Sequence, residues 1–267
     1  MTLMNRSTSL PDEVLDVVAK RVDLLSELQS GPQRRSTLQK DCDISRSTAY
    51  TALKELTEYS LVTRTEDGYR LTLYGQVILE KYLTLQQQVG KLSAARDGLE
   101  PLSEVPDAER LLQSDPTIVT PTDCDPDRPV DVFEELVRGA DKLVGFSPIT
   151  RSRYVSLFGT CILDGELTAS LINETSVVEY LLENHHDDFE AVVTADHVDF
   201  YTTDADLPFG LLVVQSPTPM VVCNLYDNQH TLQTLVYNDD PDAVTWGREI
   251  FEAERTRSSP VTQARFE

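Results

Sequence analysis

The side chains best suited to recognition chemistry gather in one short segment that begins at Ser45. A guanidinium can donate two hydrogen bonds to one guanine edge in the major groove of DNA, so Arg46 is the first candidate for reading a base. Polar side chains beside it would contact the groove, and the first residues of the segment would bind a phosphate. The groove candidates are Ser47, Tyr50, Thr51 and Lys54, and the phosphate candidates are Ser45 and Thr48.

A second set of basic residues surrounds this segment. Arg34, Arg35 and Lys40 precede it, and Arg64 and Arg70 follow it. Because backbone contacts position a protein on the duplex, we expect these five side chains to bind phosphates. A polar helix face with an Arg, a Tyr and a Lys is, taken alone, more often simply solvated. The elements around the face must therefore decide between the two interpretations.

The sequence around these residues predicts three helices. The first begins at Pro11 and ends near Ser30, and its apolar side chains recur every three or four positions. The apolar face expected for it is Val14, Leu15, Val18, Val22, Leu25 and Leu28. A short helix fits residues 36–42, a tight turn follows, and a third helix runs from 45 to about 59, capped by the Ser45 hydroxyl. Its expected core face is Ala49, Ala52 or Leu53, and Leu56. Two helices joined by a short turn predict a helix-turn-helix.

Two short β-type runs follow the third helix. They span residues 61–65 and 69–72, and Glu66-Asp67-Gly68 separates them. Asp-Gly is a strong hairpin signal because it tolerates positive φ, so a wing is predicted. The acidic pair at its tip favours contact with the DNA backbone over deep insertion into the minor groove.

One long helix is predicted from Leu73 to Ala95. Its apolar side carries Val77, Ile78, Leu85, Val89 and Leu92. Nothing in a winged module requires so long an extension, and its usual purpose is to pair with the same helix of a second subunit. We therefore expect a homodimer.

The string from Ile44 to Gly75, ISRSTAYTALKELTEYSLVTRTEDGYRLTLYG, resembles the recognition helix and wing of archaeal winged helix-turn-helix transcriptional regulators. The resemblance implies binding to double-stranded DNA. Each match is to a generic pattern, whereas the whole string in this order is specific to the family.

The charge of the chain is divided unevenly. The formal net charge is -22, yet residues 1–100 hold 13 Lys+Arg against 14 Asp+Glu, so the acidity belongs to the second half. Asp and Glu outnumber Lys by 45 to 6, a balance that suits a protein kept soluble in molar salt, where self-repulsion is screened. This composition indicates a protein from a halophile. Because the bias is an adaptation to the solvent, it gives no evidence for or against a DNA partner.

Length and hydropathy bound the class of protein. The 267 residues suit about two domains, and no stretch approaches the roughly 18 apolar residues that a membrane helix needs. The first ten residues lack the basic and apolar regions of a signal peptide. We expect a cytoplasmic protein with no membrane partner.

The predicted organisation has three parts. Residues 1–75 form the winged helix-turn-helix, residues 76–106 the connecting helix and a linker at 97–106, and residues 107–267 an effector domain. Strands separated by helices, then consecutive strands, predict a mixed α/β sheet in the last part. The expected helices there are 107–113, 131–140, 153–163, 176–185 and 241–257, and the expected strands are 117–119, 143–146, 167–172, 191–193, 198–202, 210–215, 220–224 and 231–236.

Three further strings carry a second resemblance. LPFGLLVV from Leu207, LYD from Leu225 and DDPDAVTWGREIFEAER from Asp239 resemble the C-terminal effector domain of haloarchaeal regulators, the domain named for the archaeal methanogenesis regulator. The resemblance covers residues 107–257 and implies a sensor and dimer-supporting domain whose ligand is generally unidentified. Relatives are Gly-rich before the Tyr-Asp pair, whereas this chain has Val222-Cys223-Asn224.

Catalytic and metal-binding signatures are missing from the sequence. The phospholipase-type sheet, to which such domains have been likened, needs a His-x-Lys pair, and none of the four histidines has a Lys two residues on. Gly-x-Ser-x-Gly and phosphate-binding glycine loops are also missing. His185-His186-Asp187-Asp188 suggests a metal site, but neighbours on a helix point about 100° apart, so a solvated helix end is the better interpretation. We expect no enzyme, no metal and no cofactor.

A ligand site in the second domain is expected beyond the carboxyl ends of its strands. Ser147 and Asn173 follow two predicted strands, and Arg151 or Arg153 would bind an anion beside them. The alternative is that Ser147 caps a turn with Pro148 and that Asn173 merely ends a strand.

These features together predict a homodimeric, sequence-specific DNA-binding transcriptional regulator, modulated by an unidentified small-molecule effector. One alternative is a ligand-free architectural protein or protein-interaction scaffold. Another is an enzyme with a DNA-tethering module, whose mark would be turnover abolished by a substitution at Ser147, Asn173 or His185.

Overall fold

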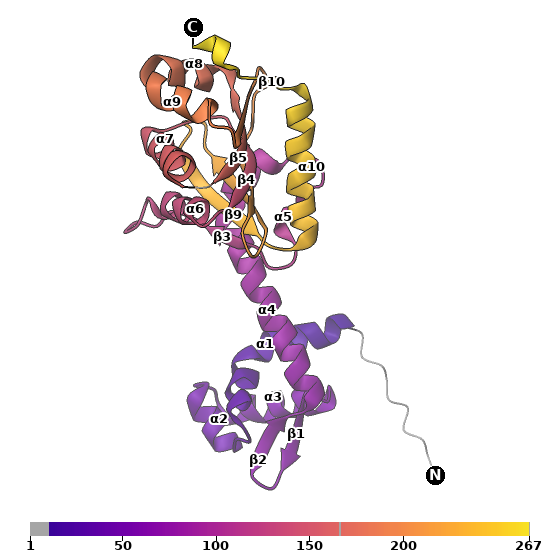
Figure 1. Cartoon of the computed structure of the whole chain (residues 1–267). Coiled ribbons are helices and arrows are strands. Elements are labelled where there is room, and N and C mark those ends of the chain that lie inside the picture. Colours follow the sequence, from indigo (N-terminus) through magenta and orange to yellow (C-terminus); the bar gives the residue numbers. More distant parts are fainter. Residues whose placement is uncertain (1–10, 166, 267) are drawn as a thin grey trace. The chain divides into compact units, whose positions relative to one another are not determined.

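The computed structural model describes residues 11–165 and 167–266 (Figure 1). The chain divides into two compact units, Met1–Gly90 and Lys91–Glu267. Each unit has its own hydrophobic core, and each is described by itself.

The first unit has the predicted order of helices and hairpin. It contains α1 (Pro11–Glu27), α2 (Arg35–Asp41), α3 (Arg46–Glu58), β1 (Val62–Thr65), β2 (Gly68–Leu71) and α4 (Leu73–Ala95) up to Gly90. Asp43 makes the turn between α2 and α3 at a φ of 48°. The Ser45 hydroxyl accepts a hydrogen bond from the Thr48 N–H at 3.1 Å, which confirms the predicted cap of α3. This arrangement is a winged helix-turn-helix.

The core of the first unit is built from leucines of four helices and from the leucine that precedes β1. Leu25, Leu38, Leu56, Leu61 and Leu79 are fully buried. The predicted core face of α3 is confirmed, and both of the alternatives within it, Ala52 and Leu53, are buried.

The predicted face of the first helix is wrong in part. Leu15 is 45% exposed, whereas Val17 and Leu24 are buried. The buried positions 14, 17, 18, 24, 25 and 28 keep a single three-four spacing, and Leu15 lies beside this stripe instead of on it. The stripe continues past Arg21, although the φ of -123° and ψ of 17° at that residue are not helical.

The hairpin is tied to the segment that precedes α2. β1 and β2 pair antiparallel, with Thr65 opposite Gly68. The backbones of Gln33 and Tyr69 exchange two hydrogen bonds of 2.8 Å. Gly68 has a φ of 139°, and a Cβ there would lie 2.3 Å from the Gln33 carbonyl oxygen. Glycine is therefore required at the position that the hairpin signal identified.

The second unit is built on an eight-stranded mixed sheet with the order β10-β6-β5-β4-β7-β8-β9-β3. β4, β5 and β6 are parallel, and the other neighbours are antiparallel. The prediction of a mixed α/β sheet is confirmed. The strands are β3 (Thr117–Val119), β4 (Lys142–Ser147), β5 (Thr168–Glu174), β6 (Val198–Thr203), β7 (Gly210–Gln215), β8 (Met220–Tyr226), β9 (Leu232–Asn238) and β10 (Ser259–Pro260).

Helices cover both faces of this sheet (Figure 1). One face carries α5 (Glu109–Leu112) and α10 (Pro241–Arg257). The other carries α6 (Arg128–Arg138), α7 (Ser152–Gly159), α8 (Thr175–Asn184) and α9 (His186–Val193), with a π-helical turn, η3 (Thr160–Asp164), after α7. Successive side chains of β7 alternate between the two cores, with Leu211 and Val213 toward α10 and Leu212 and Val214 toward the α6–α9 layer.

Two predictions for the second unit are corrected by the structure. Residues 191–193 are the end of helix α9, not a strand. The segment 97–106 is packed against the core instead of forming a free linker, because η2 (Arg96–Leu102) buries Leu102 and places Leu99 against it. Apolar side chains spaced three apart suit this 3-10 helix.

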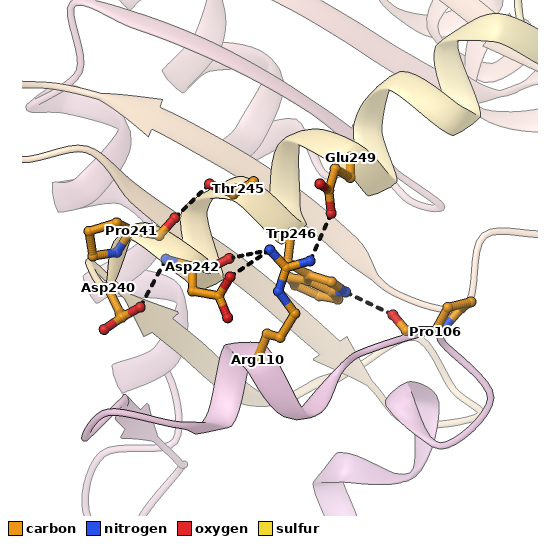
Figure 2. Close-up of polar contacts among 8 residues, drawn as sticks. All are labelled: Pro106, Arg110, Asp240, Pro241, Asp242, Thr245, Trp246 and Glu249. Carbon is orange, nitrogen blue, oxygen red and sulfur yellow. Dashed lines mark hydrogen bonds and ion pairs between the residues drawn. The ribbon is translucent and has the colours of Figure 1, made fainter.

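An ion-pair clamp fixes α5 against the start of α10 (Figure 2). The two terminal nitrogens of Arg110 lie 2.8 Å from carboxylate oxygens of Asp242 and Glu249. Beside them the Trp246 indole donates to the Pro106 carbonyl oxygen at 2.9 Å. The Asp240 side chain caps α10 by accepting from the Asp242 N–H.

No helix within the described residues is long and apolar enough to span a lipid bilayer.

Candidate functional site

Helix α3 presents one buried face and one fully solvated face. Every predicted groove candidate lies on the solvated face, and the Tyr50 ring is 58% exposed. An aromatic side chain stabilises a fold mainly when it is buried, so the exposed Tyr50 ring contributes little to folding. The face is therefore available for a partner. Its members are Arg46, Ser47, Tyr50, Thr51 and Lys54.

The N-terminal end of α3 is a hydroxyl cluster. Ser45 Oγ lies 2.9 Å from Ser47 Oγ and 2.8 Å from Thr48 Oγ1. Because Ser45 already accepts from the Thr48 N–H, its own role is to cap the helix. A phosphate at this end would meet the remaining first-turn N–H groups and the hydroxyls of Ser47 and Thr48.

The basic side chains of the first unit differ in whether they are already neutralised. Lys54 pairs with Glu58 at 3.7 Å, and both are about two-thirds exposed, so the pair contributes little to stability. Within the part of the chain that the structure describes, no ion pair forms at the other six predicted contacts. These are Arg34, Arg35, Lys40, Arg46, Arg64 and Arg70, and all but the half-buried Arg35 are exposed. Their charges are free for a polyanion.

The two wing arginines lie on opposite faces of the hairpin. Arg64 stands opposite Tyr69 in the antiparallel register, and Arg70 stands opposite Thr63. Side chains alternate between faces along a strand, and directly opposed residues share a face. A single DNA strand running along one face of the wing would therefore meet one arginine and not the other.

In the second unit, Ser147 and Asn173 line the same cavity. It lies between the sheet and helices α7, α8 and α9 and has a volume of about 90 Å³. The two residues are paired in register at the ends of the parallel strands β4 and β5. Ser147 Oγ donates to the Ile149 carbonyl oxygen at 2.8 Å, so the side chain also fixes the turn around Pro148.

The two arginines predicted beside them lie elsewhere. Arg153 forms ion pairs with Glu134 and Asp131 and does not line the cavity. These contacts raise the pKa of the Arg153 guanidinium. Arg151 donates to the His230 carbonyl oxygen at 2.8 Å, on a separate and more open hollow. The expected anion site at Ser147 and Asn173 is therefore not assembled from these side chains.

Three polar residues of the cavity escaped the sequence analysis. Tyr154, Asn224 and Tyr226 are 5%, 4% and 8% exposed. Tyr154 Oη, Asn224 Oδ1 and Tyr226 Oη make no hydrogen bond among the residues that the structure describes. Each unsatisfied buried group of this kind costs roughly 1–3 kcal/mol. Burial raises the pKa of both tyrosines, so both hydroxyls remain protonated at neutral pH.

The sequence does contain a signal for two of these residues. Asn224 and Tyr226 alternate with buried apolar residues on β8, and this alternation turns them both toward the α6–α9 layer. Gly210 of the LPFG segment pairs with Asn224, and a Cβ at Gly210 would lie only 3.2 Å from Tyr226 Oη. The two conspicuous strings LPFG and LYD therefore meet at this cavity.

The predicted helix end at His185 to Asp188 is the junction between α8 and α9. His186 Nδ1 lies 3.5 Å from Asp187 Oδ1, but no group of three metal-ligating side chains occurs in the described ranges.

The fold defines a winged helix-turn-helix protein that carries a mixed α/β unit. Family models agree with both parts. Residues 13–93 match the HVO_A0261 N-terminal domain, and residues 126–257 match the middle domain of the methanogenesis regulatory protein FilR1. The α/β unit therefore resembles a domain of a regulatory protein. No curated protein sequence matches the chain.

Solved structures resemble the chain only distantly. TrmBL2, an archaeal chromatin protein, has 15% identity and a TM-score of 0.42, covering 94% of this chain and 100% of that one. NucT from Helicobacter pylori has 7% identity and a TM-score of 0.41, covering 55% and 99%. Nuc from Salmonella typhimurium, a phospholipase D family member, has 6% identity and a TM-score of 0.41, with the same coverage.

Proposed function

We propose that the chain is a homodimeric, sequence-specific DNA-binding regulator of transcription whose α/β unit modulates DNA binding. The observation that carries this proposal is the solvated face of α3, which holds Arg46, Tyr50 and Lys54 on a winged helix-turn-helix. The match of residues 126–257 to a domain of a regulatory protein supports it independently.

In this proposal α3 enters the major groove. Arg46 lies in its first turn, where a recognition helix contacts base edges, and reads a guanine. Ser47, Tyr50, Thr51 and Lys54 contact neighbouring bases or backbone. The unpaired cations of α2 and the wing bind phosphates and set the register on the duplex.

The dimer is proposed to form through α4 of a second copy. Leu85 and Val89 lie one turn apart and are 52% and 51% exposed. Ile78, Leu85 and Leu92 recur at intervals of seven, with Val89 between the last two, and this is the spacing of a coiled coil. An identical helix supplies the matching stripe. We accordingly assign DNA binding to residues 1–75, dimerisation to 76–106 and effector sensing to 107–267.

The alternative function is an architectural protein that coats DNA without reading its sequence. A map of chromosomal occupancy in the native host at its native salt separates the two. Peaks that share a sequence motif with two half-sites support the regulator, and sequence-blind coverage would falsify it. Growth at two salt concentrations provides the control, because phosphate contacts alone weaken steeply with salt, whereas base contacts keep the same preferred sites.

The effector role has its own test. The full-length protein is purified from its host and the molecules released on denaturation are identified by mass spectrometry. A single compound bound in stoichiometric amount supports a sensor, whereas a chain that carries none and responds to none in DNA binding supports the scaffold.

A further inference from the structure

The cavity between the sheet and helices α7, α8 and α9 has a chemistry that defines its occupant. We propose that it binds a small, uncharged, largely apolar molecule with one hydrogen-bonding group, held by Tyr226, Tyr154 and Asn224. The proposal rests on the proposed function only for its regulatory consequence, because the binding site itself lies wholly within the second unit.

The body of the cavity is apolar and aromatic. Phe133, Phe158, Phe189 and Phe200 contribute rings from α6, α7, α9 and β6, and Leu212 lines it from the sheet. The Phe189 and Phe200 rings pack edge to face, with their centroids 5.0 Å apart. The volume of about 90 Å³ is of the order of the roughly 150 Å³ engineered cavity that accepts benzene. A ligand of about one small ring fits this space.

The polar end of the ligand is defined by three buried atoms that make no hydrogen bond of normal geometry, although the side chains of Ser147 and Asn224 lie close enough to the Tyr226 hydroxyl to lower its pKa against the larger raising effect of burial. Two of them, the hydroxyls of Tyr154 and Tyr226, can donate, and Asn224 Oδ1 can only accept. All three belong to side chains that are more than nine-tenths buried. A hydroxyl or a carbonyl with a neighbouring N–H satisfies such a set, whereas a hydrocarbon leaves every one of these atoms unpaired.

The charges around the cavity disfavour an anionic ligand. Asp188 is the charged residue among its described lining residues, and it is exposed. Arg153 is paired with Asp131 and Glu134, and Arg151, which donates to the His230 carbonyl oxygen, does not line the cavity. An anion would be buried without a counter-ion and would meet the Asp188 carboxylate, at a large desolvation cost. The site therefore favours a neutral group over an anion.

The test uses phenol, toluene and benzoate as probes with the full-length protein in molar KCl, measured by isothermal titration calorimetry. Phenol and toluene have the same size and differ in one hydroxyl, and benzoate carries a charge. We expect saturable binding of phenol, affinity for toluene at least about tenfold lower, and no binding of benzoate. Failure of phenol to bind, or equal binding of benzoate, overturns the proposal.

A conservative variant separates recognition from structure. Tyr226→Phe removes an unpartnered hydroxyl and keeps the ring, so it is expected to lower phenol affinity about tenfold and to raise the Tm of the free protein. Tyr180→Phe, at an exposed tyrosine of α8 outside the cavity, is expected to change neither. A lower Tm for Tyr226→Phe with unchanged phenol affinity would assign the hydroxyl to folding and reject the site.

The proposed function and this site fail independently. Calorimetry with phenol contains no DNA, so a chain that never binds DNA specifically can still have the site. Conversely, a chain that binds its operator but not phenol remains a regulator without this ligand class. Fluorescence anisotropy of operator DNA with and without phenol then measures whether the two are coupled.

Discussion

Asn173 donates its side-chain amide to the carbonyl oxygen of Ser147 at 3.0 Å, across the paired ends of strands β4 and β5. This bond closes the two strands at the edge of the cavity. The two residues line the cavity and also lie at the ends of their strands. Their donors are used by backbone oxygens, so the unpartnered groups of Tyr154, Asn224 and Tyr226 are the better ligand contacts.

The first prediction concerns this bond. Asn173→Ala leaves the Ser147 carbonyl oxygen without its side-chain donor and is expected to destabilise the second unit by about 1–2 kcal/mol. Denaturant unfolding followed by circular dichroism measures the change. Asn184→Ala, which removes an exposed Asn that bonds to Tyr180 within its own helix, is the control and is expected to change stability by less than about 0.5 kcal/mol.

The second prediction separates base reading from phosphate binding. Arg46→Ala is expected to relax preference at one base pair of the operator, at a cost of about 1–3 kcal/mol on the preferred site. Arg34→Ala is expected to weaken all sites alike and to reduce the dependence of affinity on salt. Anisotropy titrations on the operator, its single-base variants and random DNA measure both. Equal losses on specific and random DNA for both variants contradict the assignment of α3 to the groove.

The third prediction addresses self-association. Leu85→Glu places a charge on the exposed apolar stripe of α4 and is expected to shift the protein from dimer to monomer. Sedimentation velocity at several protein concentrations gives the change, expected as at least about a tenfold rise in the dimer dissociation constant. Gln86→Glu introduces the same charge at the next exposed position. Identical behaviour of the two variants rules out the α4 interface.

The fourth prediction is a pH dependence at the loop between β8 and β9. The Asp227 carboxylate accepts hydrogen bonds from the N–H groups of Thr231 and Gln229, both at 2.8 Å, and from the Gln233 side chain. These bonds, the one from Thr231 first, hold the pKa of Asp227 below its ordinary value. A lowered folded-state pKa stabilises the fold above the unfolded-state pKa, and this contribution is lost as pH falls through the folded-state pKa.

Asp227→Asn is therefore expected to lower the Tm at neutral pH, and the difference from the wild type is expected to shrink below about pH 4. Thermal unfolding of both proteins between about pH 2.5 and 7 measures this difference in Tm, because the range extends to either side of the ordinary Asp pKa. A difference that stays constant over this range would show that the carboxylate does not titrate differently on folding.

The long helices and the elements whose ends carry clear capping or turn residues were predictable from the sequence. The bounds of α4 and α10 agree with the predicted residues 73–95 and 241–257. Helix α10 begins at a Pro after a capping Asp, which is a strong start signal. The wing was predictable because Gly68 supplies the positive φ that its turn requires.

Short segments and cavity residues were not predictable in this way. Ala191-Val192-Val193 has the composition of a strand, yet it ends α9 because Val192 packs in the core beside η3 and α7. Arg153 was a plausible anion ligand until the fold brought Glu134 and Asp131 to it. Whether the Tyr226 hydroxyl has a hydrogen-bond partner depends on residues that are distant in the sequence, so local sequence patterns could not predict it.

The outer strands of the eight-stranded sheet also determine how copies of the second unit can associate. The sheet is bounded by β3, with three residues, and by β10, with two residues of which one is Pro260. Proline donates no hydrogen bond, and such short edges expose few backbone groups to a neighbouring strand. Continuation of the sheet from one molecule into the next is therefore disfavoured. This guards a concentrated protein against fibrous aggregation, and it leaves helices as the surfaces through which two copies can recognise each other.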